Sequence, residues 1–217
     1  MSFKFVFWDW NGTILNDASA ACDAVNVMLE KRGRKTITLD EYRSMVDVPI
    51  VRFYEKVLDM SKESMKSLSD EFNPLCHKFT PENPVSSETI ELIKTLNQNG
   101  IKQYIFSSSH NKFIEPYLER FGISQYFETV LGAKDCNVGS KVERTLDYIE
   151  KNNINKDEIL FVGDMVHDSE VATAVGSECV LVSSGHQCEK ALLKTGRRVI
   201  SSLSELIDII NSKRVVL

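Results

Sequence analysis

The chain has 217 residues, 42% of them hydrophobic, which is enough for one large core or for a main domain with a smaller second one. Its 26 basic and 31 acidic residues give a net charge of -5, and no basic cluster is longer than residues 31–35, which argues against DNA or RNA as a primary partner. No apolar run approaches the roughly 20 residues that span a bilayer, and no signal peptide is recognisable, so we expect a cytoplasmic protein with no membrane partner.

The chain opens with an apolar strand, predicted over residues 3–9, and then changes to helix after helix. Residues 17–30 place apolar side chains at helical spacing, and we expect further helices at 40–48, 50–59 and 61–79, separated by Pro49 and by the turn at 59–61. Residues 14–17 would lead out of the strand, and the stiff segment 80–84 would lead back. We therefore expect a helical domain over 16–83, inserted between core segments 1–15 and 84–217.

After the insert, short apolar runs alternate with helical patterns. The runs predict strands at 102–107, 126–131, 159–163, 178–183 and 197–200. Helices are predicted at 87–99, before Gly100, and at 140–152, where Ser140 and Glu143 have the spacing of a capping box. This alternation predicts right-handed crossovers. We expect an α/β fold, a doubly wound, largely parallel Rossmann-like sheet that collects ligands at the carboxyl ends of its strands.

The cysteines and histidines give no sign of a metal centre. Five cysteines are an odd number, and none forms a Cys-x-x-Cys pair, which argues against both a disulfide framework and a zinc site. We expect most of them to be small core residues in a reducing compartment. The histidines show no ligand spacing and are expected at surface or loop positions; they are His77, His110, His167 and His186.

Four segments carry groups suited to chemistry on an anion. Asp9 ends the first strand and is followed by a sharp turn in which Gly12 is free to adopt a positive φ. Ser107 ends the second predicted strand, where hydroxyl groups can donate hydrogen bonds. Lys141 stands at a helix start, where backbone amides already favour an anion. The fourth strand leads through Gly163 to two carboxylates, at positions 164 and 168, which suit Mg²⁺.

In this order the four segments resemble the motifs of the haloacid dehalogenase-like (HAD) phosphohydrolases, in the phosphoglycolate phosphatase-like branch with a helical cap. The resemblance is specific only at the motifs, and Val142 stands where that branch commonly has proline. It implies that Asp9 is a nucleophile that forms an aspartyl-phosphate. The implied metal ligands are Asp9, the backbone carbonyl of Asn11, Asp164 and, through water or from further away, Asp168. The implied phosphate-binding residues are Gly12, Thr13, Ser107, Ser108 and Lys141, and Gly185 resembles a glycine turn of the same branch.

Asn11 departs from the family pattern, which has a second aspartate at this position. That aspartate protonates the leaving group and later activates water, whereas an amide can only orient the leaving group. We therefore expect an Mg²⁺-dependent phosphohydrolase of a small phosphorylated metabolite, slowed most with alkyl leaving groups. His110 and His167 are candidates for the missing acid.

Two other functions stay open. The segment from Asp9 to Thr13 is similar to the Asp-Trp-Ala-Gly-Thr motif of phosphonoacetaldehyde hydrolases, which form a Schiff base through a cap lysine. Pro49 stands at the corresponding position, with Lys56 and Lys62 nearby. Alternatively, the loss of the acid could mark a protein that binds a phosphorylated ligand without turning it over.

Overall fold

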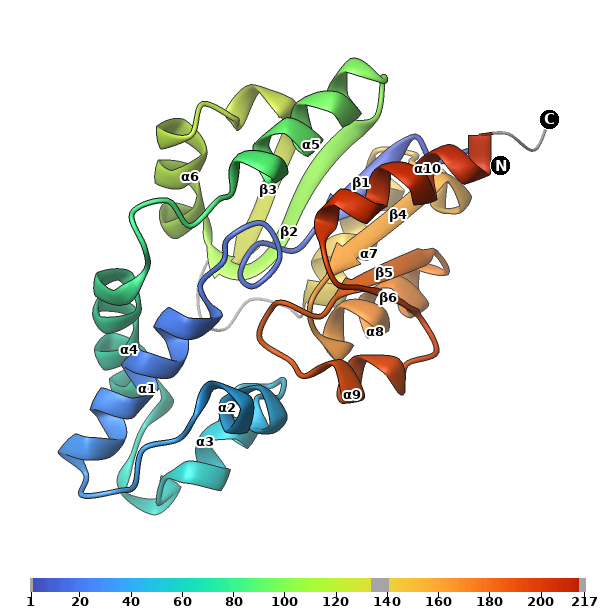
Figure 1. Ribbon diagram of the computed structural model, residues 1–217. Coiled ribbons are helices and arrows are strands. Elements are labelled where there is room, and N and C mark those ends of the chain that lie inside the picture. The colour runs from blue at the N-terminus through green and yellow to red at the C-terminus, as the bar shows by residue number, and fades with distance from the viewer. Residues whose placement is uncertain (1, 134–140, 215–217) are drawn as a thin grey trace.

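The centre of the computed structural model, which describes residues 2–133 and 141–214, is a parallel six-stranded sheet in the order β3-β2-β1-β4-β5-β6 (Figure 1). The strands are β1 (Phe5–Trp8), β2 (Lys102–His110), β3 (Phe127–Ala133), β4 (Ile159–Gly163), β5 (Glu178–Val182) and β6 (Arg198–Ile200). All six predicted strands are present, and every pair of neighbours is parallel. The predicted doubly wound α/β fold is confirmed.

The strand order reverses beside β1, and this is where the fold creates a crevice. Trp8 at the end of β1 pairs with Ile105 of β2 on one side and with Val162 of β4 on the other. The backbone amide of Asp9 continues the ladder by donating to the carbonyl of Val162 at 2.8 Å. Residues that follow β1, β2 and β4 therefore meet at one edge, the carboxyl ends of adjacent strands.

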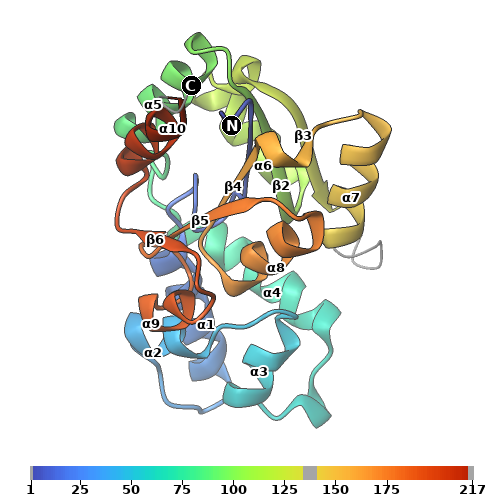
Figure 2. The same cartoon turned by 90° about the vertical axis from the view of Figure 1, so that its right-hand side faces the viewer.

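Helices cover both faces of the sheet, because successive side chains of each strand point to opposite faces (Figures 1 and 2). Val6 and Trp8 pack in one hydrophobic cluster with α5 (Ser87–Gln98), α6 (Asn111–Arg120) and α10 (Leu206–Arg214). Phe7 faces the other way and stacks on Phe106 at 4.6 Å, within a cluster that includes α7 (Lys141–Lys151), α8 (Val166–Val175) and α9 (Glu189–Leu193). Ser140, the predicted cap of α7, lies outside the described residues. Among the helices described, none is long and apolar enough to cross a membrane.

The predicted helical insert forms a separate group of helices beyond the carboxyl ends of the strands (Figures 1 and 2). Its helices are α1 (Ala18–Lys31), α2 (Leu39–Met45), α3 (Val51–Val57) and α4 (Met65–Phe79). They bury a hydrophobic cluster of their own around Met28, Phe53 and Leu68. The amide of Asn16 donates to the carbonyl of Pro84 at 2.8 Å, which joins the outgoing and returning segments.

One predicted helix of the insert begins later than expected. Instead of a continuous helix from 61 to 79, the chain forms a 3-10 turn at Met60–Lys62 and starts α4 at Met65. Ser64 sets this start, because its side chain accepts a hydrogen bond from the amide of Ser67 at 3.1 Å and so caps the new helix. The four described cysteines are free thiols, two buried (Cys22 and Cys179) and two half-buried (Cys76 and Cys188), while Cys136 lies outside the described residues.

We expect Arg32→Met to lower the free energy of unfolding by about 1 to 2 kcal/mol, because hydrogen bonds between charged groups stabilise a fold more than hydrogen bonds between neutral groups. Arg32 donates through Nε to Glu63 at 2.6 Å and through Nη2 to Glu71 at 2.9 Å, which ties α1 to two other segments of the insert. The control is Lys66→Met, which removes an exposed pair with Asp70 within one helix and should cost less than about 0.5 kcal/mol. Urea unfolding of both variants measures the difference.

The effect of Arg32→Met should also depend on pH. Hydrogen bonding to Arg32 lowers the pKa of Glu63, and Arg32 lowers the pKa of Glu71 against the opposing effect of burial. A glutamate whose pKa is depressed on folding stabilises the fold above its ordinary pKa of 4.5 and loses that effect as the pH falls below it. The native protein and the variant should therefore converge in stability at acid pH. A difference that does not change with pH would contradict this.

Candidate active site

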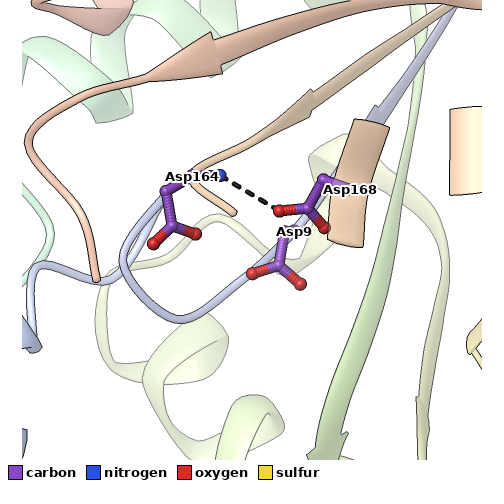
Figure 3. A group of neighbouring side chains, drawn as sticks. All are labelled: Asp9, Asp164 and Asp168. Carbon is purple, nitrogen blue, oxygen red and sulfur yellow. Dashed lines mark hydrogen bonds between the residues drawn. The ribbon is translucent and has the colours of Figure 1, made fainter. Parts of the chain in front are cut away.

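Three carboxylates from separate segments meet at the crevice (Figure 3). Asp9 follows β1, Asp164 follows β4, and Asp168 lies in the first turn of α8. One oxygen atom of each lies within 4.8 Å of the others. Asp168 Oδ2 accepts hydrogen bonds from the amides of Asp164 and Met165, at 3.1 and 3.0 Å, so its carboxylate also fixes the turn after β4. The sequence predicted that these three residues share one site, and the structure brings them together.

Lys141, the first residue of α7, places its ammonium group between two of these carboxylates. Its Nζ lies 2.5 Å from Asp9 Oδ1 and 2.6 Å from Asp168 Oδ1. The side chain is only 6% exposed, and burial opposes its charge, but Asp168 and Asp9 raise the pKa of Lys141 above its ordinary value. The lysine therefore stays protonated and supplies one fixed positive charge to the cluster.

The Asp164 carboxylate is held from both sides. The hydroxyl of Thr13 donates to its Oδ1 at 3.0 Å, and the backbone amide of His186 donates to its Oδ2 at 2.6 Å. Two glycines make room for it. A Cβ atom on Gly12, whose φ is +73°, would lie 2.2 Å from Asp164 Oδ2, and one on Gly185 would lie 2.3 Å from the same atom. Thr13 was predicted to bind phosphate, and its hydroxyl here orients a carboxylate.

Burial makes the carboxylates reluctant to carry their charge without a cation. It raises the pKa of Asp9 to about 6 although Lys141 opposes the shift, and it raises the pKa of Asp164 to about 7 although His186 opposes it. Three carboxylates and one ammonium group leave the cluster with more negative than positive charge when all are ionised. Such a set of oxygen donors fits Mg²⁺, which prefers carboxylate ligands and would offset the excess charge.

The serines in the last part of β2 lie at the same edge of the sheet. Ser107 is buried, its Oγ accepts a hydrogen bond from the amide of Ser109 at 3.0 Å, and its carbonyl accepts one from Arg144 Nη2 at 3.0 Å. Ser108 is exposed. The end of β2 is thus held in a defined shape, in part by Arg144 of α7, the helix that also carries Lys141.

The side chain of Asn11 bridges two loops. Its Oδ1 accepts from Ser109 Oγ and its Nδ2 donates to Asp17 Oδ2, both at 2.6 Å. Sequence reasoning missed Asp17, because it reads as the linker residue before α1. The structure shows it almost fully buried, with its Oδ1 accepting a hydrogen bond from the amide of Gly12 at 2.9 Å.

The histidine in contact with this network is His186, whereas the side-chain contacts of the two predicted candidates are with other residues. His110 caps α6 and accepts from the amide of Lys112, and His167 pairs with Glu170 on α8. His186 was expected at a surface or loop position. It does lie in a loop, but its ring is buried between Asp17 Oδ1, at 3.1 Å from Nε2, and the Tyr42 hydroxyl, at 2.9 Å from Nδ1. The sequence signal for His186 was its position directly after Gly185, and the family resemblance pointed only to the glycine.

The lysines that could serve as a Schiff-base nucleophile are engaged outside the crevice. Lys56 Nζ donates to the carbonyl of Met45 at 2.6 Å, in an exposed position. Lys62 is 79% exposed and pairs with Asp59 at 3.4 Å. Neither contact involves a residue of the carboxylate cluster, so the structure gives the aldehyde-binding alternative no support.

Known proteins resemble this chain in sequence and in fold. The family described as haloacid dehalogenase-like hydrolase matches residues 6–182. A phosphoglycolate phosphatase of Photobacterium profundum is 23% identical, over 95% of both chains. Two solved structures show the same fold: a predicted phosphatase from Clostridium acetobutylicum (TM-score 0.77, 18% identity, 98% and 100% covered) and Protein Tyrosine Kinase A of Mycobacterium tuberculosis (TM-score 0.76, 20% identity, 96% and 98% covered). The chain therefore belongs to the haloacid dehalogenase-like hydrolase family, in its phosphatase branch.

Proposed function

We propose that this protein is an Mg²⁺-dependent phosphohydrolase that acts on a small phosphorylated metabolite through an aspartyl-phosphate on Asp9. The observation that carries the proposal is the meeting of Asp9 with Lys141, Asp164 and Asp168 at the point where the strand order reverses. Its relatives named phosphoglycolate phosphatase support the reaction class.

In the first step an oxygen of Asp9 attacks phosphorus, the bond from phosphorus to the leaving oxygen breaks, and its electron pair stays with that oxygen. Lys141 would neutralise charge on the attacking carboxylate and on the phosphoryl oxygens, and Ser107 and Ser108 would donate hydrogen bonds to those oxygens. Water then attacks phosphorus, which releases phosphate and restores Asp9. Mg²⁺ held by Asp9, Asp164 and the Asn11 carbonyl, with Asp168 in support, would offset negative charge on the transferring group.

Asn11 would make this reaction selective for its leaving group. General acid-base catalysis contributes about 10² to 10⁴ in rate, and an amide cannot supply it. The leaving groups of acyl phosphates and activated aryl phosphates depart without a proton, so the absence of an acid should slow the hydrolysis of these substrates least. Alkyl phosphates should be slow substrates.

The test is a screen of purified protein with and without Mg²⁺ against acetyl phosphate, p-nitrophenyl phosphate, phosphoglycolate and phosphonoacetaldehyde. We expect Mg²⁺-dependent phosphate release in decreasing order from the first to the third. Absence of turnover with every compound, together with binding of one of them, would favour the non-catalytic alternative. Mass spectrometry of each sample must exclude deamidation of Asn11, because the following glycine favours that reaction.

We also propose that the helices of residues 16–83 act as a cap over the site. They lie beyond the carboxyl ends of the strands, and the Tyr42 hydroxyl of α2 reaches the ring of His186 beside the carboxylate cluster. A cap in this place would exclude water from the transferring group and contact the rest of the substrate.

Gly185→Ala should weaken Mg²⁺ binding at least tenfold, as changes behind a metal ligand typically do. The added methyl group would overlap the Asp164 carboxylate, which lies 2.3 Å from its Cβ position. Gly196→Ala is the control for general destabilisation, since its φ of +71° strains any side chain but no atom lies within 4 Å of the added Cβ. The increase in melting temperature on adding Mg²⁺ should survive in the control and decrease in Gly185→Ala. An equal response in both would count against Asp164 as a ligand.

A further inference from the structure

A continuous series of hydrogen bonds runs from the helical insert to the end of β2 and passes through Asn11. The hydroxyl of Tyr42, on α2, contacts His186 Nδ1 at 2.9 Å, and His186 Nε2 contacts Asp17 Oδ1 at 3.1 Å. Asp17 Oδ2 accepts from Asn11 Nδ2 at 2.6 Å, and Asn11 Oδ1 accepts from Ser109 Oγ at 2.6 Å. We call this series the Tyr42–Ser109 chain.

Asp17 decides which way round the Asn11 amide lies. An ionised carboxylate only accepts hydrogen bonds, so the group that faces it must be the NH₂ of the amide and not its oxygen. Three donors surround Asp17 and suit an ionised carboxylate: Asn11 Nδ2, the amide of Gly12 and the ring of His186. Burial alone would raise the pKa of Asp17, but His186 and these hydrogen bonds lower it.

His186 connects this arrangement to the insert. The loop that carries it lies against α2 in both views (Figures 1 and 2). Arg43 of α2 donates to the carbonyl of Gly185 at 2.9 Å and to that of Ser184 at 2.7 Å, and the amide of Cys188 donates to the carbonyl of Arg43 at 3.1 Å. The position of the His186 ring, and with it the contact to Asp17, therefore depends on how α2 is seated.

We propose that Tyr42, His186 and Asp17 are positioning residues that fix the Asn11 amide, so that its second Nδ2 hydrogen serves as a neutral donor to the leaving-group oxygen. This inference rests on the proposed phosphatase function. The amide gives up no proton in the step: the electron pair of the broken bond stays on the leaving oxygen, and water protonates it later. An amide held in one orientation stabilises that charge without reorganising, whereas a mobile amide would not.

The test compares Tyr42→Phe with Tyr54→Phe. Tyr42→Phe removes the hydroxyl from the chain but keeps the ring that packs against Phe53 at 5.5 Å. Tyr54 also contacts Phe53 at 5.5 Å and lies in the same hydrophobic cluster, outside the chain, so it is the matched control. We expect Tyr42→Phe to lower kcat about three- to tenfold for an alkyl phosphate, less for p-nitrophenyl phosphate, and to leave KM nearly unchanged. Tyr54→Phe should change neither.

A double-mutant cycle separates positioning from a general structural effect. In an Asn11→Ala background, which has no amide to orient, Tyr42→Phe should have no further effect on kcat. Multiplicative effects of the two substitutions would overturn the inference. Asp17→Asn gives a second variant, since it places an amide donor against the Asn11 NH₂. It should lower kcat when Asn11 is present and have no further effect on kcat in the Asn11→Ala background.

Nuclear magnetic resonance tests the positioning without turnover. The side-chain NH₂ signals of Asn11, identified by their loss in Asn11→Ala, should shift in Tyr42→Phe and stay in place in Tyr54→Phe. If the native protein hydrolyses none of the phosphates, the proposed function fails, and these signals still show whether the chain holds the amide. Unshifted signals in Tyr42→Phe would overturn the inference even in an active enzyme.

Discussion

Asp9→Asn should abolish turnover of every phosphate that the native protein hydrolyses, with a loss on the order of 10⁴-fold or more. The reason is chemical, because an amide oxygen is a poor nucleophile toward phosphorus. The position of Asp9 is specific to this role: it follows the central strand at the crevice, is 12% exposed and pairs with Lys141 at 2.5 Å. A carboxylate there is kept ionised by the lysine although burial raises its pKa to about 6.

The covalent intermediate offers a direct measurement of this role. Since Asn11 cannot take a proton from the attacking water, hydrolysis of the aspartyl-phosphate should be slow relative to its formation, and labelled phosphate should accumulate on the native protein with acetyl phosphate as donor. Acid quenching and peptide mapping should locate the label on Asp9. Asp9→Asn should carry none.

A surface substitution of the same kind gives the control. Asp147→Asn removes an exposed carboxylate on α7 that pairs with Lys151 at 3.6 Å, and it should keep full turnover and labelling. Persistent turnover in Asp9→Asn, in protein shown by mass spectrometry to be free of deamidation at position 9, would mean that another group attacks phosphorus. The assignment of the nucleophile would then be wrong.

The fold could be predicted because its signals are local. Each strand is a short apolar run bounded by turn residues, and in β4, for example, all five residues are buried. The helix boundaries were less accurate where a side-chain cap decides them. Ser64 starts α4 within a stretch whose apolar spacing looks continuous. The helix predicted over 40–48 ends earlier than predicted, at Met45, ahead of Pro49, which disfavours helical backbone in the residue before it.

The carboxylate cluster was also predictable, since Asp9, Asp164 and Asp168 each follow a strand and parallel strands end at the same edge. The partners of Asn11 were not. Asp17 lies only six residues away, but its neighbour His186 is 169 residues from it, and Tyr42 is 144 residues from that histidine. No periodicity or spacing links these three, because their contact depends on how the helical insert is seated on the core.

These contacts also show why Asn11→Asp alone should fail to create an efficient phosphatase. The new carboxylate would stand where Nδ2 now donates to Asp17 Oδ2 at 2.6 Å, so a half-buried carboxylate would face the buried one of Asp17. One of the pair must then bind a proton or the loop must move. We expect a loss of about 1 to 3 kcal/mol in the free energy of unfolding, the usual cost of an unmatched buried polar group.

Exchanging the two side chains, Asn11→Asp with Asp17→Asn, should avoid that conflict. At position 17 the amide oxygen can replace Oδ1, which accepts from Gly12 and His186, while the amide nitrogen replaces Oδ2 and donates to the carboxylate at position 11. Ser109 Oγ can donate to that carboxylate as it now does to Asn11. The net charge is unchanged, and position 11 gains a group that can exchange protons.

The exchanged variant should hydrolyse phosphoglycolate or another alkyl phosphate about 10² to 10⁴ times faster than the native protein, the range that general acid-base catalysis contributes. With acetyl phosphate, formation of the aspartyl-phosphate should change far less, because its leaving group needs no proton, while hydrolysis of that intermediate should become faster and less label should accumulate on Asp9. Each single substitution is the control: Asn11→Asp should be less stable than the exchanged variant, and Asp17→Asn should be slower than the native protein. If the exchanged variant has native stability and alkyl phosphates remain as slow as before, the missing carboxylate is not what limits this enzyme, and the substrate contacts of the helical insert become the place to look.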